Sequence, residues 1–167
     1  MSNRVQIIGI GSPFGDDRFG WEAAEALRHS AAMNAVAPGR VEILALDRPG
    51  AMLPMHWQET DIVILLDAVR SGAAPGTRHC LETRDLPGTG GLCSSHGFGI
   101  VPTIELARAL GNMPSRLLVR GIEADSTWMG FCLSPAVAGA LPLFVADIAE
   151  EALELASFCP TAAANMA

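Results

Sequence analysis

The fold is decided by the stretch DIVILLDAV at residues 61–69, which is apolar on both faces between its two aspartates. A strand of this kind is typical of the centre of a parallel sheet that helices cover on each side. Three further runs, at residues 4–11, 41–46 and 116–122, have a similar apolar, β-branched character. Residues 77–83 form a more polar run, which we expect to be an edge strand.

Segments with apolar residues at helical spacing alternate with these strands. We expect helices over residues 21–33, 49–57 and 102–110, and a long amphipathic helix from residue 135. Asp16 or Asp17 is available as the N-cap of the first helix.

This alternation predicts an α/β, three-layer sandwich, in which a twisted, mostly parallel sheet of about five strands carries helices on both faces. We expect a single domain over residues 1–159 and a disordered tail over residues 160–167.

Composition excludes several classes of protein. The 167 residues carry a net charge of −7, which disfavours nucleic acid as a partner because phosphate backbones require clustered Lys and Arg. No apolar run approaches the roughly 18 residues of a membrane span, and the N-terminus shows no basic-then-apolar leader. Four cysteines without a C-x-x-C pair (Cys80, Cys93, Cys132 and Cys159) favour a reducing, cytoplasmic location.

Polar residues that could carry chemistry are expected where parallel strands end, because ligands bind beyond the carboxyl ends of such a sheet. Asp16 and Asp17 follow the first strand, Asp67 ends the most apolar strand, and His96 lies in the glycine-rich segment 86–99. A dinucleotide site after the first strand is disfavoured, because two adjacent carboxylates would repel a pyrophosphate. If one of these two aspartates caps the helix, the other remains available as a ligand.

Each candidate also has a purely structural or alternative interpretation. Asp67 could accept backbone N–H groups from the turn that follows it, and Cys93 or Ser95 could pair with His96 as a nucleophile and base. His29, His56 and His79 are most simply surface or helix-face residues. Two carboxylates and an imidazole that converge on one crevice would suit a borderline divalent ion such as Zn²⁺ or Ni²⁺.

Three motifs in this order resemble those of the [NiFe]-hydrogenase maturation endopeptidases. The stretch GIGSPFGDDRFG at residues 9–20 resembles that family's G-x-G-N opening followed by D-[DE]-x-x-G. The dipeptide Asp67-Ala68 resembles its D-A strand end, and Ser95-His96 resembles its loop histidine. The chain departs from the family at Ser12, which replaces the usual Asn, and at residues 47–50, where DRPG replaces a D-G-G-T-like turn.

The resemblance implies an endopeptidase that removes the C-terminal extension of a hydrogenase large-subunit precursor after nickel insertion. It maps the family's nickel-contacting positions to Asp17, Asp67 and His96, which are then both the catalytic and the metal-binding residues. The nickel belongs to the substrate, so no resident cofactor is expected, although Zn²⁺ or Cd²⁺ can occupy such a site in vitro. The alternatives are a non-cleaving, metal-sensing chaperone of the same fold and a Cys/Ser–His hydrolase of small molecules.

Overall fold

The computed structural model describes residues 4–82, 93–94 and 100–158. The sheet is formed by six strands within these residues: β1 (Val5–Gly11), β2 (Val41–Asp47), β3 (Ile62–Arg70), β4 (Arg78–Glu82), β5 (Cys93–Ser94) and β6 (Arg116–Glu123). The helices are the 3₁₀ segments η1 (Gly15–Arg18) and η2 (Gly50–His56) and the α-helices α1 (Phe19–Arg28), α2 (Ala31–Asn34), α3 (Ile100–Ala109) and α4 (Pro135–Phe158).

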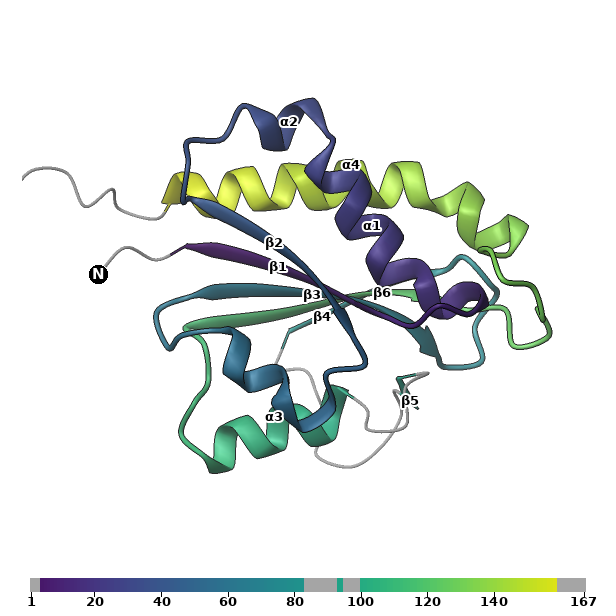
Figure 1. Ribbon diagram of the computed structural model, residues 1–167, viewed down its shortest axis with the longest axis horizontal. Helices are drawn as coiled ribbons and strands as arrows, with labels where there is room; N and C mark the ends of the chain where they lie inside the picture. The colour runs from purple at the N-terminus through teal and green to yellow at the C-terminus, as the bar shows by residue number, and fades with distance from the viewer. Residues whose placement is uncertain (1–3, 83–92, 95–99, 159–167) are drawn as a thin grey trace, which may run out of the picture.

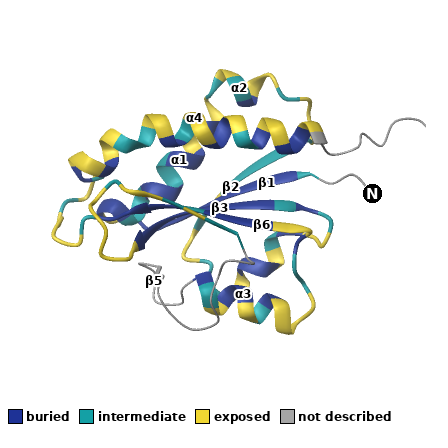
Figure 2. Cartoon of the chain, turned by 180° about the vertical axis from the view of Figure 1, so that it is seen from behind, coloured by how far each residue is buried: buried dark blue, intermediate teal, exposed yellow. Residues whose placement is uncertain are grey.

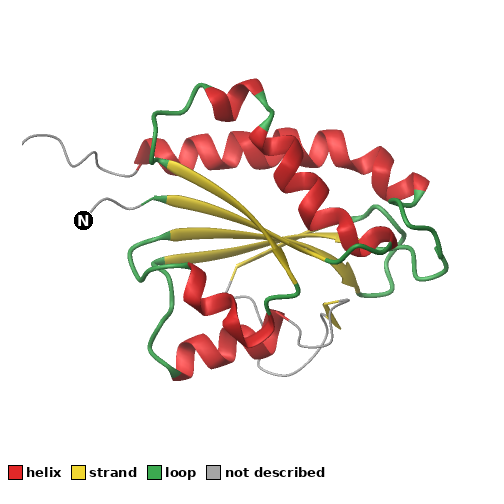
Figure 3. Ribbon diagram, viewed as in Figure 1, coloured by secondary structure: helices red, strands yellow, loops and turns green. Residues whose placement is uncertain are grey.

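The sheet has the strand order β2-β1-β3-β6-β4, and β5 pairs with β3 outside this path. The first four of these strands are parallel, whereas β4 runs antiparallel along the β6 edge. The expected sheet of about five mostly parallel strands is therefore confirmed, with β5 as a two-residue addition. The chain passes from β1 to β2 on one side and then to β3 on the other, so the strand order reverses between β1 and β3 (Figure 3).

The sheet separates two apolar cores. Helices α1, α2 and α4 cover one face, and α3 with η2 covers the other (Figure 1). The first core contains Phe19 and Phe144, whose rings meet edge to face at 4.8 Å, and the second contains Leu53 and Trp57. The central strands are buried on both faces, as the run at residues 61–69 predicts (Figure 2). No helix in these ranges is long and apolar enough to cross a membrane.

One expected helix is divided in two. The prediction of a continuous helix over residues 21–33 is wrong, because α1 ends at Arg28 and α2 begins at Ala31. Ser30 lies between them with extended backbone, and its hydroxyl accepts a hydrogen bond from Met33 N at 3.2 Å. A serine that caps the next helix in this way competes with continuation of the first.

Glycine at position 20 lets helix α1 touch the sheet. A Cβ atom built there would lie 2.0 Å from Ile10 O and 2.6 Å from Leu66 O, which are both backbone atoms. Gly9 on β1 is restricted in the same way, because a Cβ atom built there would lie 2.0 Å from Gly20 O. The start of α1 is therefore pressed against β1 and β3 at once, and the preceding η1 segment is held at the carboxyl ends of these strands.

Candidate functional site

The point where β1 and β3 separate is the natural place for a ligand. β1 pairs with β3 as far as Gly9↔Leu66, whereas β3 continues to Arg70. In open α/β sheets, ligands bind beyond the carboxyl ends of the strands where the order reverses. Asp17 follows the first of these two strands, and Asp67 lies in the second.

Asp17 lies in η1, which a tight turn places directly after β1. Its backbone carbonyl accepts a hydrogen bond from Ser12 N at 3.0 Å, and its own N–H donates to Phe14 O at 3.1 Å. The side chain is 20% exposed, and the buried Oδ1 atom has no hydrogen-bond donor in the described structure. Within the described part of the chain, Arg70 Nη2 lies 3.7 Å from this oxygen, too far for a hydrogen bond but close enough for an ion pair. A buried carboxylate oxygen that accepts no hydrogen bond within the described structure is suited to bind an incoming ligand.

Asp16, its neighbour, has a structural role. The carboxylate is 5% exposed and accepts three hydrogen bonds, from Asp125 N at 2.8 Å, Ser134 N at 2.6 Å and Ser134 Oγ at 2.9 Å. It fastens η1 to the connection between β6 and α4. The prediction that Asp16 or Asp17 caps the first helix is wrong, since Arg18 holds the N-cap position of α1 and no side chain caps it.

Asp67 is fully buried within β3. Its Oδ1 accepts a hydrogen bond from Ala68 N at 2.8 Å, which confirms one contact of its expected structural role. The prediction that Asp67 ends its strand is wrong, because β3 continues three residues further to Arg70 through pairing with β6 and β5. Asp67 faces Gly121 in the register and directly follows Leu66, whose carbonyl lies against Gly20 of α1. Gly20 is three residues after Asp17, so the structure brings both aspartates to one corner of the sheet.

His96 lies outside the described residues, as does Ser95. The strand β5 ends two residues earlier in the sequence, and it pairs antiparallel with the end of β3 through Val69↔Ser94 and Arg70↔Cys93. Among the described residues, no group of three His, Cys, Asp or Glu side chains could hold a metal ion. The predicted set of Asp17, Asp67 and His96 thus has two members in the described structure.

Sequence reasoning missed the pairing of Glu123 with His79. Glu123 at the end of β6 is 2% exposed and accepts hydrogen bonds from Ser71 N, Ser71 Oγ and Gly72 N at 2.8–2.9 Å. His79 Nε2 lies 2.9 Å from Glu123 Oε2, so the prediction of a surface or helix-face histidine is wrong. Burial alone would raise the pKa of Glu123, but the hydrogen bonds from Ser71, Gly72 and His79 hold this pKa below its ordinary value.

The hydrogen bonds that Glu123 accepts fix the turn at Ser71 and Gly72, beside the site. Ser71 and Gly72 directly follow Arg70, the residue that faces Asp17. A cavity of about 350 Å³ opens here, and it is lined by Arg70, by Gly72, Ala73 and Pro75 of the turn, and by Glu123 to Thr127 at and after the end of β6. The charged pattern of residues 77–83 predicts an edge strand, but only the fold shows that one of its side chains reaches Glu123 on β6.

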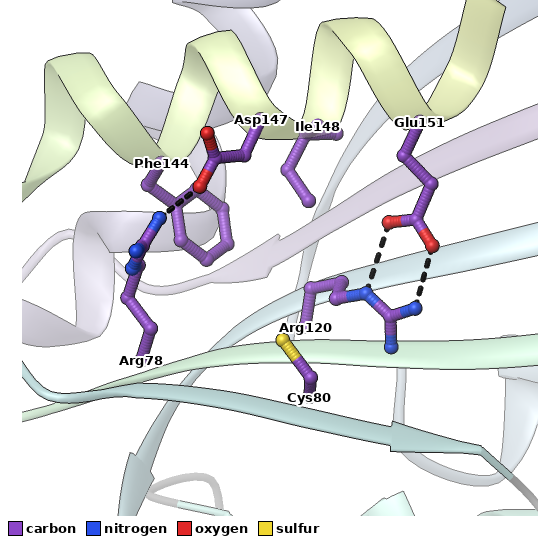
Figure 4. Close-up of a pocket in the computed structure, with 7 residues that line it drawn as sticks. All are labelled: Arg78, Cys80, Arg120, Phe144, Asp147, Ile148 and Glu151. Atoms are coloured by element: carbon purple, nitrogen blue, oxygen red, sulfur yellow. Dashed lines mark hydrogen bonds and ion pairs between the residues drawn. The ribbon is translucent and has the colours of Figure 1, made fainter. Parts of the chain in front are cut away.

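A second cavity, of about 390 Å³, lies between β4 and α4 (Figure 4). Two ion pairs cross it, Arg78 with Asp147 and Arg120 with Glu151. Cys80 points into it from β4, and its thiol is free. Neither of the two predicted site residues that the structure describes lines this cavity, so the candidate site is the corner at Asp17 and Asp67.

Comparison with known proteins agrees with this fold. Residues 26–151 match the HycI family, described as hydrogenase maturation proteases. The hydrogenase expression/formation protein HupD of Rhodobacter capsulatus is 30% identical over 152 residues, which cover 89% of this chain and 70% of HupD. The hydrogenase 2 maturation protease of Escherichia coli is 28% identical, over 80% of this chain and 81% of that protein. The solved structure of the hydrogenase maturating endopeptidase HybD from E. coli superimposes with a TM-score of 0.76 at 26% identity, over 93% of this chain and 94% of HybD.

Proposed function

Because this chain belongs to the hydrogenase maturation protease family and is therefore a peptide hydrolase, we propose that it cleaves the C-terminal extension from a [NiFe]-hydrogenase large-subunit precursor. The substrate carries its nickel into the reaction, and the enzyme recognises that ion. A reducing cytoplasm is the proposed compartment, in keeping with the free thiols of Cys80 and Cys132.

The single observation that carries this proposal is the state of Asp17. Its buried Oδ1 has no hydrogen-bond donor among the residues that the structure describes, and it lies in the corner that also holds the buried Asp67. Hard oxygen ligands of this kind complete the coordination of a divalent ion. We propose that Asp17, Asp67 and His96 supply the three ligands.

Recognition of the metal makes cleavage dependent on nickel insertion. A precursor without nickel meets two carboxylates that have no partner on the peptide, and it is released. A precursor with nickel gains the ligand bonds, so its binding is favoured by the free energy of completing the coordination sphere. In the proposed reaction the ion also polarises the scissile carbonyl or lowers the pKa of an attacking water.

The cavity beside Arg70 gives the departing peptide a place. It opens between the carboxyl ends of β3 and β6, and Arg70 connects it to Asp17. A guanidinium at its edge suits a carbonyl or carboxylate of an extended peptide. The fixed turn at Ser71 and Gly72 holds one wall of this cavity in place.

The test is a processing assay with the precursor in its nickel-loaded and nickel-free forms. The wild-type protein is expected to shorten only the loaded precursor, and Asp17→Asn, Asp67→Asn and His96→Gln are each expected to abolish the product. Asp147→Asn removes a carboxylate on α4 and is the matched control, with processing unchanged. Equal cleavage of both precursor forms would contradict recognition of nickel, and loss of cleavage in Cys93→Ala or Ser95→Ala would indicate a nucleophile instead.

A further inference from the structure

Four large apolar side chains are exposed together beside the candidate site. Phe14 is 57% exposed, Trp128 39%, Met129 91% and Phe131 75%. Phe14 precedes η1, and the other three belong to the connection between β6 and α4. The rings of Phe14 and Phe131 lie 6.4 Å apart, which joins the two segments into one surface. We call these four residues the apolar corner. A clustered apolar surface of this kind marks an interaction site more often than scattered exposed residues do.

The apolar corner has a defined shape. Trp128 Nε1 donates a hydrogen bond to Cys132 O at 2.7 Å, and the indole ring folds over Gly130. A Cβ atom at Gly130 would lie 2.6 Å from this ring, so only glycine leaves room for it. A ring held in this way loses little conformational entropy when a partner binds, which is why tryptophan is frequent at binding hot spots.

The apolar corner is continuous with the candidate metal site. Phe14 O accepts the hydrogen bond from Asp17 N, and the Asp16 carboxylate binds the backbone of Asp125 and Ser134 at both ends of the other segment. A protein that brings a metal ion to Asp17 therefore comes close to the two segments that carry these side chains.

From this continuity we infer that the apolar corner binds an apolar surface of the hydrogenase precursor next to its nickel ligands, an inference that rests on the proposed function. The enzyme then has two contacts with its substrate: the ion, which reports that loading is complete, and the apolar corner, which holds the surrounding protein. Met129 and Phe131 are the most exposed of the four, so they are the side chains that the precursor would cover most.

The experiment compares two double variants of the whole chain. Met129→Ser/Phe131→Ser removes half of the apolar corner. The control Met55→Ser/Leu110→Ser removes two largely exposed apolar side chains, one in η2 and one directly after α3. Binding to the nickel-loaded precursor, binding of Cd²⁺ alone and the sedimentation coefficient are measured for each. The first variant is expected to raise the Kd for the precursor roughly tenfold or more, with Cd²⁺ binding and folding unchanged. The second is expected to match the wild type.

Each other outcome has a definite meaning. Wild-type affinity in Met129→Ser/Phe131→Ser overturns the inference while the proposed function stands, provided that Asp17→Asn still abolishes processing. An equal loss in both double variants also overturns it, because the effect would then reflect general surface hydrophobicity. If the wild type is a dimer and Met129→Ser/Phe131→Ser converts it to a monomer, the apolar corner is a surface for self-association instead, and the inference is overturned. If the wild type neither binds nor cleaves the precursor, the proposed function fails and this inference fails with it.

Discussion

The adjacent residues Asp16 and Asp17 are expected to respond in opposite ways to the same substitution. Asp16→Ala removes the acceptor of three hydrogen bonds, two of them from the backbone N–H groups of Asp125 and Ser134. Hydrogen bonds to a charged group contribute about 1.5–3 kcal/mol each, and each buried N–H left without an acceptor costs about 1–3 kcal/mol. Since the Ser134 hydroxyl can turn to other acceptors, we expect a loss of about 3–5 kcal/mol in the free energy of unfolding.

Asp17→Ala is expected to leave stability almost unchanged. Among the described residues its side chain has one ion pair, at 3.7 Å to a half-exposed Arg70, and such pairs contribute about 0–1 kcal/mol. Asp17→Ala should instead abolish processing of the precursor completely. Asp16→Ala should still cleave the nickel-loaded precursor at low temperature, where enough of it remains folded.

The assay combines urea unfolding of both variants with the processing reaction at about 15 °C and 37 °C. A domain that has lost several kcal/mol of stability is expected to remain largely folded at the lower temperature and to unfold at the higher one. Equal destabilisation by the two substitutions would refute the division into a structural and a ligand carboxylate. Full processing by Asp17→Ala would refute the role of Asp17 as a ligand, whatever its stability.

Three further predictions concern the surroundings of this site. The pKa of Glu123 is held below its ordinary value of 4.5, so this residue stabilises the folded state above that pH and loses the effect as the pH falls through the lower folded pKa. Glu123→Gln should therefore flatten the acid side of a curve of stability against pH, and it should cost about 1–3 kcal/mol at neutral pH. Arg70→Ala should tighten Cd²⁺ binding in calorimetry several-fold by removing a cation beside Asp17, whereas Arg116→Ala, at the other end of the sheet, should not; weaker binding in Arg70→Ala would contradict this. Gly20→Ala should lose about 3 kcal/mol or more in urea unfolding because its Cβ meets two backbone oxygens, and Gly139→Ala, with open space in α4, serves as the control that should be neutral or stabilising.

The parts of the fold that the sequence predicts are those with a local cause. The apolar run at residues 61–69 requires burial on both faces wherever it lies, so it identifies the central strand without knowledge of its neighbours. The charges at residues 77–83 similarly predict an edge strand, because a central position would bury them. Arg70, the one residue by which β3 extends beyond this run, depends instead on pairing with Cys93 of β5, and no residue within the run signals it.

The candidate site shows the same division. Its position at the carboxyl ends of β1 and β3 follows from the alternation of strands and helices, and the motifs point to Asp17 and Asp67. The separate roles of Asp16 and Asp17 do not follow, since the partners of Asp16 lie 109 and 118 residues further along the chain. The contact between His79 and Glu123 spans 44 residues and is equally hidden in the local pattern. Long-range partners of this kind are decided by the tertiary structure and leave no trace in spacing.

The hydrogen bonds that Asp16 accepts also determine when the site can be completed during protein synthesis. Protein chains emerge from the ribosome from the N-terminus at about 5–20 residues per second. A nascent chain that ends before Asp125 already contains both candidate aspartates, yet it lacks both backbone donors that fasten η1 to the connection between β6 and α4. Ser134, the second partner, directly precedes α4, so the corner closes only when translation of the last helix begins. The candidate site at Asp17 and Asp67 is thus assembled late, after the sheet that carries it.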